Sequence, residues 1–600
     1  MKERIIFGYD AFVLPFTIGM IFIILYLGVG LVRIIAALSK EDRIKLVKSF
    51  VSPTLIKTIK DIIFDCLLHV KIFKKNLLLG YMHASIAFGW FMLIFIGHIE
   101  VMIYTPQRNG VLYYPVFFRY FVMETQETLR GAFFFFLMDF FLLMVLSGIA
   151  LAIYKRFKSR ALGMRRTTRL SKRDTIALYA LWAIFPLRLL AESFTADISG
   201  GSFLTKSINH LFHNFVNNSD HILPVWWAYS SALGIFLFAL PFSRYMHIPT
   251  EMLLIVLRNA GIKSDNTREG FAETEIYSCS SCGICIDACP MTTHKRNLNN
   301  TTVYFLRFLR RRNKRKPIVP ADKCLMCGKC VELCPVGIDS CRLKQFKRSD
   351  VSENGAKTDY TYLSSYSSNV KKGTKILYYS GCMTHLTPNI YKALFNVLDK
   401  ANLNYEFLDK DGSICCGRPL MLSGRKEEAK GLVEKNSRLI KESGADILLV
   451  SCPICYKMFN EEYDLGKIKL LHHTQLIDSM IADKTLNINK SDKSFVFHDP
   501  CELGRGSNIY KQPRRVLTSQ GRVVEANFNK KESICCGGSL GSLALSKPER
   551  DAITKHSIES LTYNKPDTIV TACPLCYKTF SQLSGTPVKD IAQVTAENLI

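Results

Sequence analysis

Cysteine is almost absent from the first 278 residues of this chain. Of its twenty cysteines, only Cys66 precedes residue 278. No G-x-G-x-x-G turn opens a helix after an expected strand, so nothing marks a flavin or nicotinamide site. Hydride chemistry is therefore expected in a partner, or not at all. The first apolar segment lacks a small-residue cleavage site, which argues against a removed signal peptide. The clustering of the other nineteen cysteines predicts a dedicated cysteine chemistry in the C-terminal part of the chain.

The net charge of +27 comes largely from two basic blocks, residues 155–173 and 307–316. Nucleic-acid binding would call for a recognition fold beside them, and none is predicted. The first block directly follows an apolar segment, which is typical of a cytoplasmic membrane anchor. The second block is either a docking site for an acidic flavoprotein or a solvated charged face.

Five segments are long and apolar enough to cross a bilayer: 12–37, 77–103, 131–154, 174–194 and 223–246. Basic residues follow the first segment (Lys40, Arg43, Lys45 and Lys48) and the third. Loops rich in Lys and Arg stay on the cytoplasmic side. We therefore expect an inner-membrane protein with its N-terminus outside and its cysteine-rich part in the cytoplasm, the compartment that suits exposed thiols.

Two histidines are placed where they could hold a haem. His83 lies near the inner end of the second apolar segment, and His247 ends the fifth. Because these segments run in opposite directions, both imidazoles are expected at the same depth on the cytoplasmic side. They are candidate axial ligands of haem b. The alternative for each is an interfacial histidine at a helix end.

The N-terminal half resembles the dihaem cytochrome b family found in respiratory nitrate reductase and heterodisulfide reductase. The likeness rests on 240-LPFSRYMHI-248, in which His247 takes the inner ligand position. The family's outer ligand positions correspond to Tyr229 and Leu93, so the resemblance implies one haem rather than two. His98 has no obvious partner at its depth, and His69 is expected to be structural.

Three polar residues inside the apolar segments have two possible roles. Asp139, Arg188 and Glu192 are candidates either for a quinone pocket or for helix pairing.

Two runs have the spacing C-x-x-C-x-x-C-x-x-x-C-P of bacterial two-cluster ferredoxins, at 279–290 and 324–335. In such runs three cysteines bind one [4Fe–4S] cube and the fourth binds the other. The first cluster is assigned to Cys279, Cys282, Cys285 and Cys334. The second cluster is assigned to Cys324, Cys327, Cys330 and Cys289. The extra cysteines in register argue against zinc, and Cys341, outside both runs, is expected to be an ordinary small residue.

The rest of the cysteines form a duplicated pattern with a period of about 120 residues. The first unit holds Cys382, Cys415, Cys416, Cys452 and Cys455. The second unit holds Cys501, Cys535, Cys536, Cys573 and Cys576. Short apolar runs precede the cysteines and helical stretches separate them, which predicts parallel α/β units with the thiols at the strand ends.

This pattern, with its adjacent cysteines in 413-SICCGRPL-420 and 533-SICCGGSL-540, resembles the cysteine-rich CCG domain of the catalytic part of heterodisulfide reductase. The resemblance implies one or two noncubane [4Fe–4S] clusters, and a structural metal site is the alternative. His498 either protonates a leaving thiolate, orients the cluster, or is a buried structural histidine. Many relatives carry histidine where this chain has Glu502, which argues against a proton-donor role at that position. His385, His472 and His473 are expected to be structural.

The expected chain is therefore multidomain. A five-helix all-α transmembrane bundle (1–250) precedes an α+β or helical dicluster ferredoxin domain (251–350), a linker (351–370) and two Rossmann-like α/β CCG domains (371–485 and 486–600). The favoured function is transfer of electrons between a soluble flavoprotein or dehydrogenase and a membrane quinone. The alternatives are a disulfide reductase and a non-catalytic electron-transfer component of a respiratory complex.

Overall fold

The computed structural model describes residues 5–6, 9–122, 129–158, 168–212, 221–263, 270–293, 298–313, 315–352 and 374–600. It divides into two compact units, Met1–Gly283 and Ile284–Ile600. Most of the expected linker (351–370) and the middle of the basic 155–173 block lie outside the described residues. The domain boundaries expected from the sequence remain predictions.

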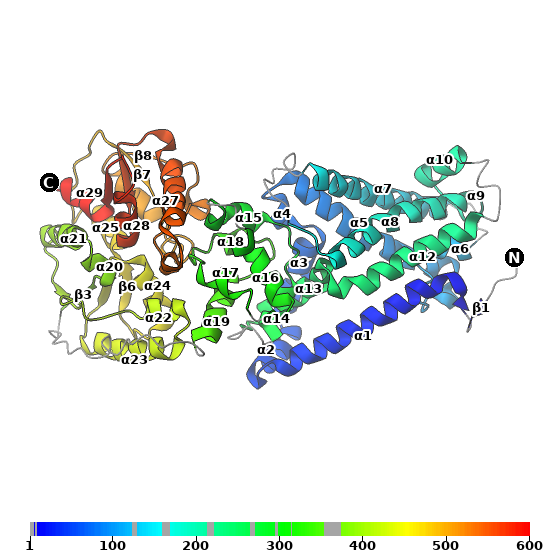
Figure 1. Cartoon of the computed structure of the whole chain (residues 1–600), viewed down its shortest axis with the longest axis horizontal. Coiled ribbons are helices and arrows are strands. Elements are labelled where there is room, and N and C mark those ends of the chain that lie inside the picture. Colours follow the sequence, from blue (N-terminus) through cyan, green and yellow to red (C-terminus); the bar gives the residue numbers. More distant parts are fainter. Residues whose placement is uncertain are drawn as a thin grey trace. The chain divides into compact units, whose positions relative to one another are not determined.

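The first unit is a helical bundle (Figure 1). Its helices are α1 (Leu14–Ala37), α2 (Lys40–Phe50), α3 (Thr54–Ile62), α4 (Val70–Phe73), α5 (Leu77–Tyr104), α6 (Phe118–Phe121), α7 (Leu129–Phe157), α8 (Lys172–Phe194), α9 (Ala196–Ser199), α10 (Phe203–Leu211), α12 (Ile222–Ala239), α13 (His247–Asn259) and α14 (Gly270–Tyr277). Strands β1 (Ile5–Ile6) and β2 (Tyr9–Asp10) form a short antiparallel pair. Five helices are long and apolar enough to cross a membrane: Ala11–Ala37, Leu77–Tyr104, Gly131–Phe157, Lys172–Phe194 and Ile222–Phe242.

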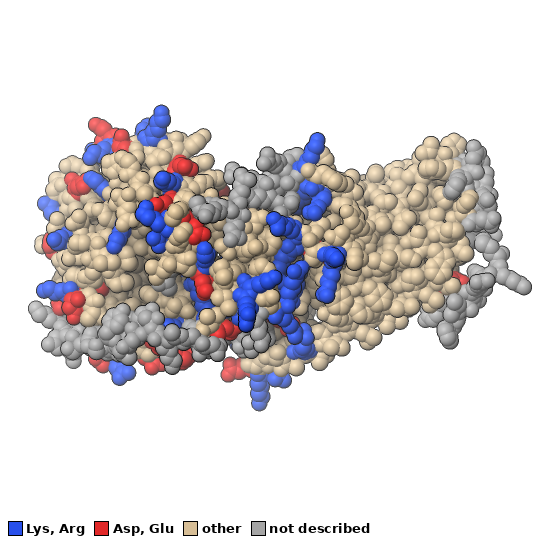
Figure 2. Space-filling view, in the orientation of Figure 1, with Lys and Arg blue, Asp and Glu red and all other residues tan. Residues whose placement is uncertain are grey.

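The bundle buries aromatic and aliphatic side chains between its long helices and exposes others outward. Leu25 and Val29 on α1 are 63% and 70% exposed, as expected for side chains that face lipid. Figure 2 shows a long face of this unit nearly without charged side chains. The five helices therefore support association with a membrane.

The polar residues inside the bundle have partners within it. Asp139 accepts hydrogen bonds from the backbone N–H groups of Leu204 and Thr205, both at 2.9 Å, and so caps the start of α10. Arg188 and Glu192 form an ion pair at 2.8 Å one turn apart on α8. The contacts of Asp139 join α7 to α10 and favour helix pairing for that residue. The pair of Arg188 and Glu192 lies within α8, so both roles considered for these two residues stay open.

The second unit begins with short helices, and Cys285 and Cys330 of the ferredoxin-type runs lie on two of them. These helices are α15 (Ile284–Ala288), α16 (Thr302–Arg310), α17 (Ile318–Asp322), α18 (Lys329–Glu332) and α19 (Ser340–Ser352). No strand occurs among the residues described between 284 and 352. Of the two expected forms of this domain, α+β or helical, the described part is helical.

Two four-stranded parallel sheets follow. The first repeat contains β3 (Ile376–Tyr379), α20 (Cys382–His385), α21 (Pro388–Lys400), β4 (Tyr405–Phe407), α22 (Arg418–Ser423), α23 (Lys426–Glu442), β5 (Ile447–Val450), α24 (Pro453–Glu462), β6 (Lys469–His472) and α25 (His473–Ala482). The second contains β7 (Ser494–Phe497), α26 (Lys511–Thr518), β8 (Arg522–Val524), α27 (Lys547–Leu561), β9 (Thr568–Thr571), α28 (Pro574–Ser581), β10 (Val588–Asp590) and α29 (Ile591–Glu597).

Both sheets have the same strand order. The orders β4-β3-β5-β6 and β10-β9-β7-β8 become 2-1-3-4 when strands are numbered within each repeat and the second sheet is read in reverse. The register pairs Tyr378 with Leu449 in the first sheet and Val496 with Ile569 in the second. Such an order places a topological switch between the first and third strands, where open parallel sheets bind ligands. The parallel sheets confirm the α/β prediction, while the Rossmann-like description remains a prediction.

Candidate iron–sulfur and haem sites

The repeat cysteines lie at the switch point of each sheet. Cys382 and Cys452 follow the neighbouring strands β3 and β5, and Cys501 and Cys573 follow β7 and β9. Carboxyl ends of parallel strands meet at one edge, so these thiols gather there. Cys452 and Cys573 are also the N-cap residues of α24 and α28. The partial positive charge of a helix N-terminus favours the thiolate, the form that binds iron.

The two repeats present their thiols to one cavity of about 530 Å³. Nine of the ten repeat cysteines line it, and Cys415 is the exception. The first cysteine of each repeat is the most accessible, because Cys382 is exposed and Cys501 half-buried while the other eight are buried. None of these ten is in a disulfide. Nine thiols lining one space are a donor set that fits iron–sulfur clusters.

The adjacent cysteines are hydrogen-bonded to each other and to the later thiols. Cys415 donates to Cys416 and holds the pKa of Cys416 well below its usual value. Cys535 does the same for Cys536, and the sulfurs of Cys536 and Cys576 are 3.3 Å apart. The second cysteine of each CC pair is therefore favoured as a thiolate, which suits a cluster ligand.

Gly381 gives the first thiol set its close packing. Its φ is +82°, and a Cβ at this position would lie 2.8 Å from Sγ of Cys455. Any larger residue would be strained and would push into the thiol. The turn between β3 and Cys382 therefore needs glycine.

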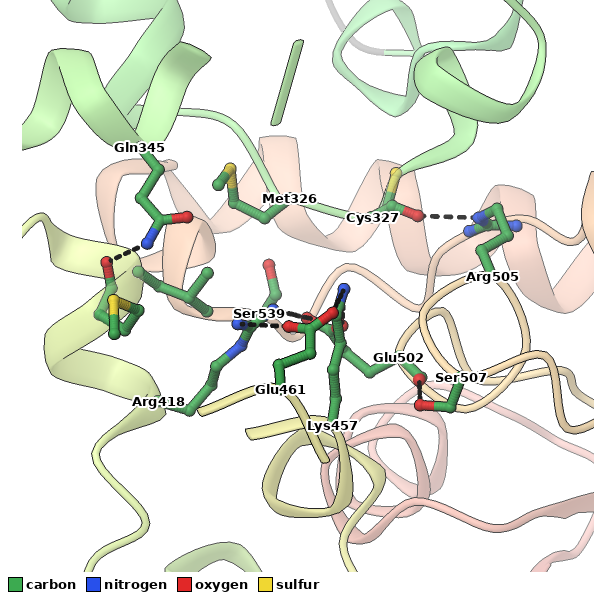
Figure 3. A network of polar contacts seen from close by, with 12 residues as sticks. Met326, Cys327, Gln345, Arg418, Lys457, Glu461, Glu502, Arg505, Ser507 and Ser539 are labelled. Carbon is green, nitrogen blue, oxygen red and sulfur yellow. Dashed lines mark hydrogen bonds and ion pairs between the residues drawn. The ribbon is translucent and has the colours of Figure 1, made fainter. Parts of the chain in front are cut away.

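The ferredoxin-type loop that carries Cys324 and Cys327 packs directly against the second repeat. Arg505 donates to the carbonyl of Cys327 at 2.8 Å (Figure 3). It also donates to the carbonyl of Ser533 at 2.9 Å. Ser539 donates to the carbonyl of Leu325 at 2.7 Å.

At this junction the two thiol sets touch. A hydrogen bond from Cys535 lowers the pKa of Cys327 to about 6. The candidate ligands of the second [4Fe–4S] cluster and of the second repeat are therefore in direct contact.

A buried lysine stands among the candidate ligands of the second [4Fe–4S] cluster. Lys344 on α19 is 2% exposed, and its Nζ lies 3.4 Å from Sγ of Cys324 and 3.2 Å from the Thr302 hydroxyl. Burial would lower the pKa of Lys344, but the charges of Cys324, Cys330 and Cys289 raise it well above its usual value. This residue was not predicted from the sequence.

Replacing Lys344 with methionine is expected to make the midpoint potential of the second cluster more negative. Reduction adds negative charge, and the ammonium stabilises that charge in a buried site. The shift should be on the order of 59 mV, a tenfold change in the ratio of reduced to oxidised cluster. An EPR-monitored redox titration measures it, with Lys347→Met as the control because Lys347 pairs with Asp350 instead. An unchanged potential would show that Lys344 does not act on this cluster.

The sequence analysis expected Cys341 to be an ordinary small residue, but in the structure its thiol contacts a candidate cluster ligand. Its thiol is hydrogen-bonded to Cys330, and the hydroxyl of Ser340 lies 3.1 Å from Sγ of Cys330. Spacing alone could not show this, because the start of α19 brings both residues back to the second run. The thiol of Cys341 supports a candidate ligand by hydrogen bonding.

An ion-pair network connects the two repeats beside the cavity (Figure 3). Glu502, which follows Cys501, contacts Arg418 and Lys457 of the first repeat, each at 3.2 Å. Burial would raise the pKa of Glu502, but Arg418 and Lys457 hold it below its usual value. Glu502 is therefore ionised at neutral pH, and here it connects the repeats rather than donating a proton.

Three described histidines of the second unit, His385, His473 and His498, are buried or paired with carboxylates. His498 has Nε2 3.2 Å from the carbonyl of Ile534, its ring packs on Phe580, and it is not among the described residues that line the cavity. His473 and His385 pair with Asp590 and Asp409 at 3.2 and 3.4 Å. These contacts favour structural roles for all three.

The candidate ligands of the first [4Fe–4S] cluster fall in both units. Cys279 and Cys282 follow α14 in the first unit, while Cys285 on α15 and Cys334 belong to the second.

The haem candidates lie in the first unit. Nδ1 of His247 donates to the carbonyl of Arg244 at 2.7 Å. This bond fixes the tautomer and puts the lone pair on Nε2, as metal-binding histidines require. His83 interacts electrostatically with His247 and with His69, whose ring stacks on it at 5.5 Å. The pairing of His83 with His247 as axial ligands remains a prediction, and His69, which the sequence analysis expected to be structural, is in ring contact with His83.

The positions of a second haem are filled by packed side chains. Leu93 is 1% exposed. Tyr229 packs against Phe117 and Trp226 with ring centroids 5.6 and 6.0 Å away. The residues at these positions do not fit a second haem.

Comparisons with known proteins identify the domains of the second unit. A cysteine-rich domain family (CCG) matches residues 376–460 and 495–581. A 4Fe–4S dicluster domain matches residues 278–338. These matches show that the chain carries a 4Fe–4S dicluster domain and two cysteine-rich CCG domains, the two kinds predicted from the cysteine spacing.

Three relatives extend this result. One component of the fumarate reductase (CoM/CoB) of Methanothermobacter marburgensis is 26% identical over 51% of this chain and 57% of its own. EtfAB:quinone oxidoreductase of Syntrophomonas wolfei is 28% identical over 37% and 34%. One component of the dihydromethanophenazine:CoB–CoM heterodisulfide reductase of Methanosarcina acetivorans is 25% identical over 54% and 78%. A putative Asp/Glu racemase structure from Yersinia pestis, at 17% identity, covers 37% of this chain and 96% of its own with a TM-score of 0.22, too low to support an argument.

The chain is thus a heterodisulfide-reductase-related iron–sulfur protein whose relatives are named oxidoreductases. It spans about half the length of the first curated relatives that it matches. The names of these relatives support a role in iron–sulfur electron transfer. The donor, the quinone and the haem are not named by these matches for this chain.

Proposed function

We propose that the chain is an inner-membrane oxidoreductase that passes electrons between a cytoplasmic flavoprotein or dehydrogenase and a membrane quinone. The contact between Cys327 and Cys535 carries this proposal, because it joins the ferredoxin-type ligands to the cavity of the repeats. The clusters, when bound, supply one-electron steps. The five apolar helices and the similarity to a quinone oxidoreductase support a membrane acceptor.

The chain's own residues hold these groups in place. The repeat thiols are proposed to bind one or two noncubane clusters, and His83 and His247 one haem b on the cytoplasmic side. Arg505 and Ser539 fix the ferredoxin-type loop against the second repeat. This rigid contact keeps the two ligand sets close enough for electron transfer.

Reduced electron-transferring flavoprotein, added anaerobically to the purified protein, is expected to reduce the haem, as followed by its absorbance. A short-chain quinone added next should reoxidise it. The Cys535→Ser/Cys536→Ser variant should show neither step, since the route from the repeats is broken. Haem reduction that persists in that variant would contradict the proposed route.

A disulfide reductase is the second candidate, and the shared cavity favours it. A space of about 530 Å³ lined by both thiol sets could admit a small disulfide. Its cleavage to two thiols requires two electrons and two protons, which the reduced clusters and the solvent would supply. Prereduced protein that is reoxidised by an added disulfide, but not by quinone, would establish this activity instead.

A further inference from the structure

A second large cavity lies in the membrane unit, away from the polar residues first considered for a quinone. It has a volume of about 600 Å³ and lies between α1, α13 and α14. Its walls are mostly apolar, with Leu25, Val29 and Leu253 among them. Because Leu25 and Val29 are largely exposed, the cavity is accessible from the surface that would face lipid.

Six polar side chains also line this mostly apolar space. The hydroxyls of Thr250 and Thr274 already donate to backbone carbonyls one turn earlier, both at 2.7 Å. The other polar side chains are the phenols of Tyr26 and Tyr277 and the ion pair between Arg33 and Glu273 at 2.9 Å. Phenol and guanidinium groups are hydrogen-bond donors of the kind that a carbonyl oxygen accepts.

The cavity also lies next to a candidate haem ligand and close in sequence to a candidate cluster ligand, both of the first unit. Met246 lines it and directly precedes His247, the proposed haem ligand. Tyr277 lines it and stands two residues before Cys279, the first residue of the first ferredoxin-type run.

We propose that this cavity is the quinone site, with the ring carbonyls toward Tyr26, Arg33 and Tyr277 and the isoprenoid tail along α1. This inference rests on the proposed function. An apolar body with a few convergent polar groups is the usual character of a small-molecule site. The quinone takes up two electrons from the redox groups of the chain and two protons, and leaves as the quinol. The protons would reach the site past the ion pair of Arg33 and Glu273, in which the Arg33 side chain is largely exposed.

Two glycines of α1 provide a matched test. Gly30 lines the cavity and Gly28 does not, and a Cβ at either position would meet no atom within 4 Å. Gly30→Leu should fill the cavity without disturbing the helix packing. Gly28→Leu adds the same side chain to the same helix outside the cavity.

The experiment uses the full chain in nanodiscs and a photoreactive azido-quinone with a short isoprenoid tail. We expect the label on peptides of α1, α13 and α14, and at least a tenfold weaker quinone affinity in Gly30→Leu with unchanged cluster spectra. Gly28→Leu should behave as the wild type. The variants Tyr26→Phe and Tyr179→Phe add a second matched pair, because Tyr179 is 62% exposed on α8 and lies outside the cavity.

The outcomes separate this inference from the proposed function. If the wild-type protein reduces quinone but the label maps elsewhere and both glycine variants behave alike, the site is wrong and the function stands. If the wild-type protein neither binds nor reduces the quinone, the proposed function itself fails. Lipid extracted from the cavity that quinone does not displace would also overturn the site.

Discussion

Replacing Cys535 and Cys536 with serine is expected to remove the cluster of the second repeat and to change the EPR spectrum of the second [4Fe–4S] cluster. The reason is the contact between Cys535 and Cys327, a candidate ligand of that cluster. Serine at 535 withdraws the thiol and alters the charge around Cys327. Iron content should fall by one cluster, and electron transfer to the haem should be lost.

The same double substitution in the first repeat is the matched control. Cys415 is hydrogen-bonded to Cys416, and Cys416 to Cys455, within its own repeat. Cys415→Ser/Cys416→Ser should therefore remove one cluster and leave the spectrum of the second [4Fe–4S] cluster unchanged. Equal spectral changes in the two variants would show that the second repeat has no special connection to the ferredoxin-type domain.

Local patterns predicted much of this architecture. The apolar lengths of the five segments agree with the helices, because a membrane span requires about twenty apolar residues. Alternation of apolar runs and helical stretches predicted the parallel sheets, and cysteines directly after those runs were correctly expected at the strand ends. Each of these inferences uses residues that are close together in the chain.

Contacts between distant residues could not be read in this way. Arg505 reaches Cys327, a residue 178 positions away, and Glu502 joins Arg418 across 84 positions. Lys344 has no motif, and only the fold brings its ammonium to Cys324. The cavity beside α1 is also invisible in the sequence, because it is formed by helices that begin at residues 14, 247 and 270.

His247→Ala is expected to abolish the haem b absorbance band while the iron–sulfur EPR signals remain. The tautomer fixed by the carbonyl of Arg244 presents Nε2 as the ligand, and alanine removes it. His83→Ala should have the same result, because a six-coordinate haem needs both imidazoles. Optical spectra of the reduced protein and a pyridine haemochrome assay measure the loss.

Two further histidines test whether this effect is specific. His98 is exposed, and its Nδ1 donates to the carbonyl of Ile94 on the same helix, so His98→Ala should leave the band unchanged. His69 stacks on His83, so His69→Ala should keep the haem and shift the band by altering the surroundings of His83. A haem lost with His69→Ala but retained with His83→Ala would assign the second axial position to His69, because only one of these two neighbours can be the ligand opposite His247.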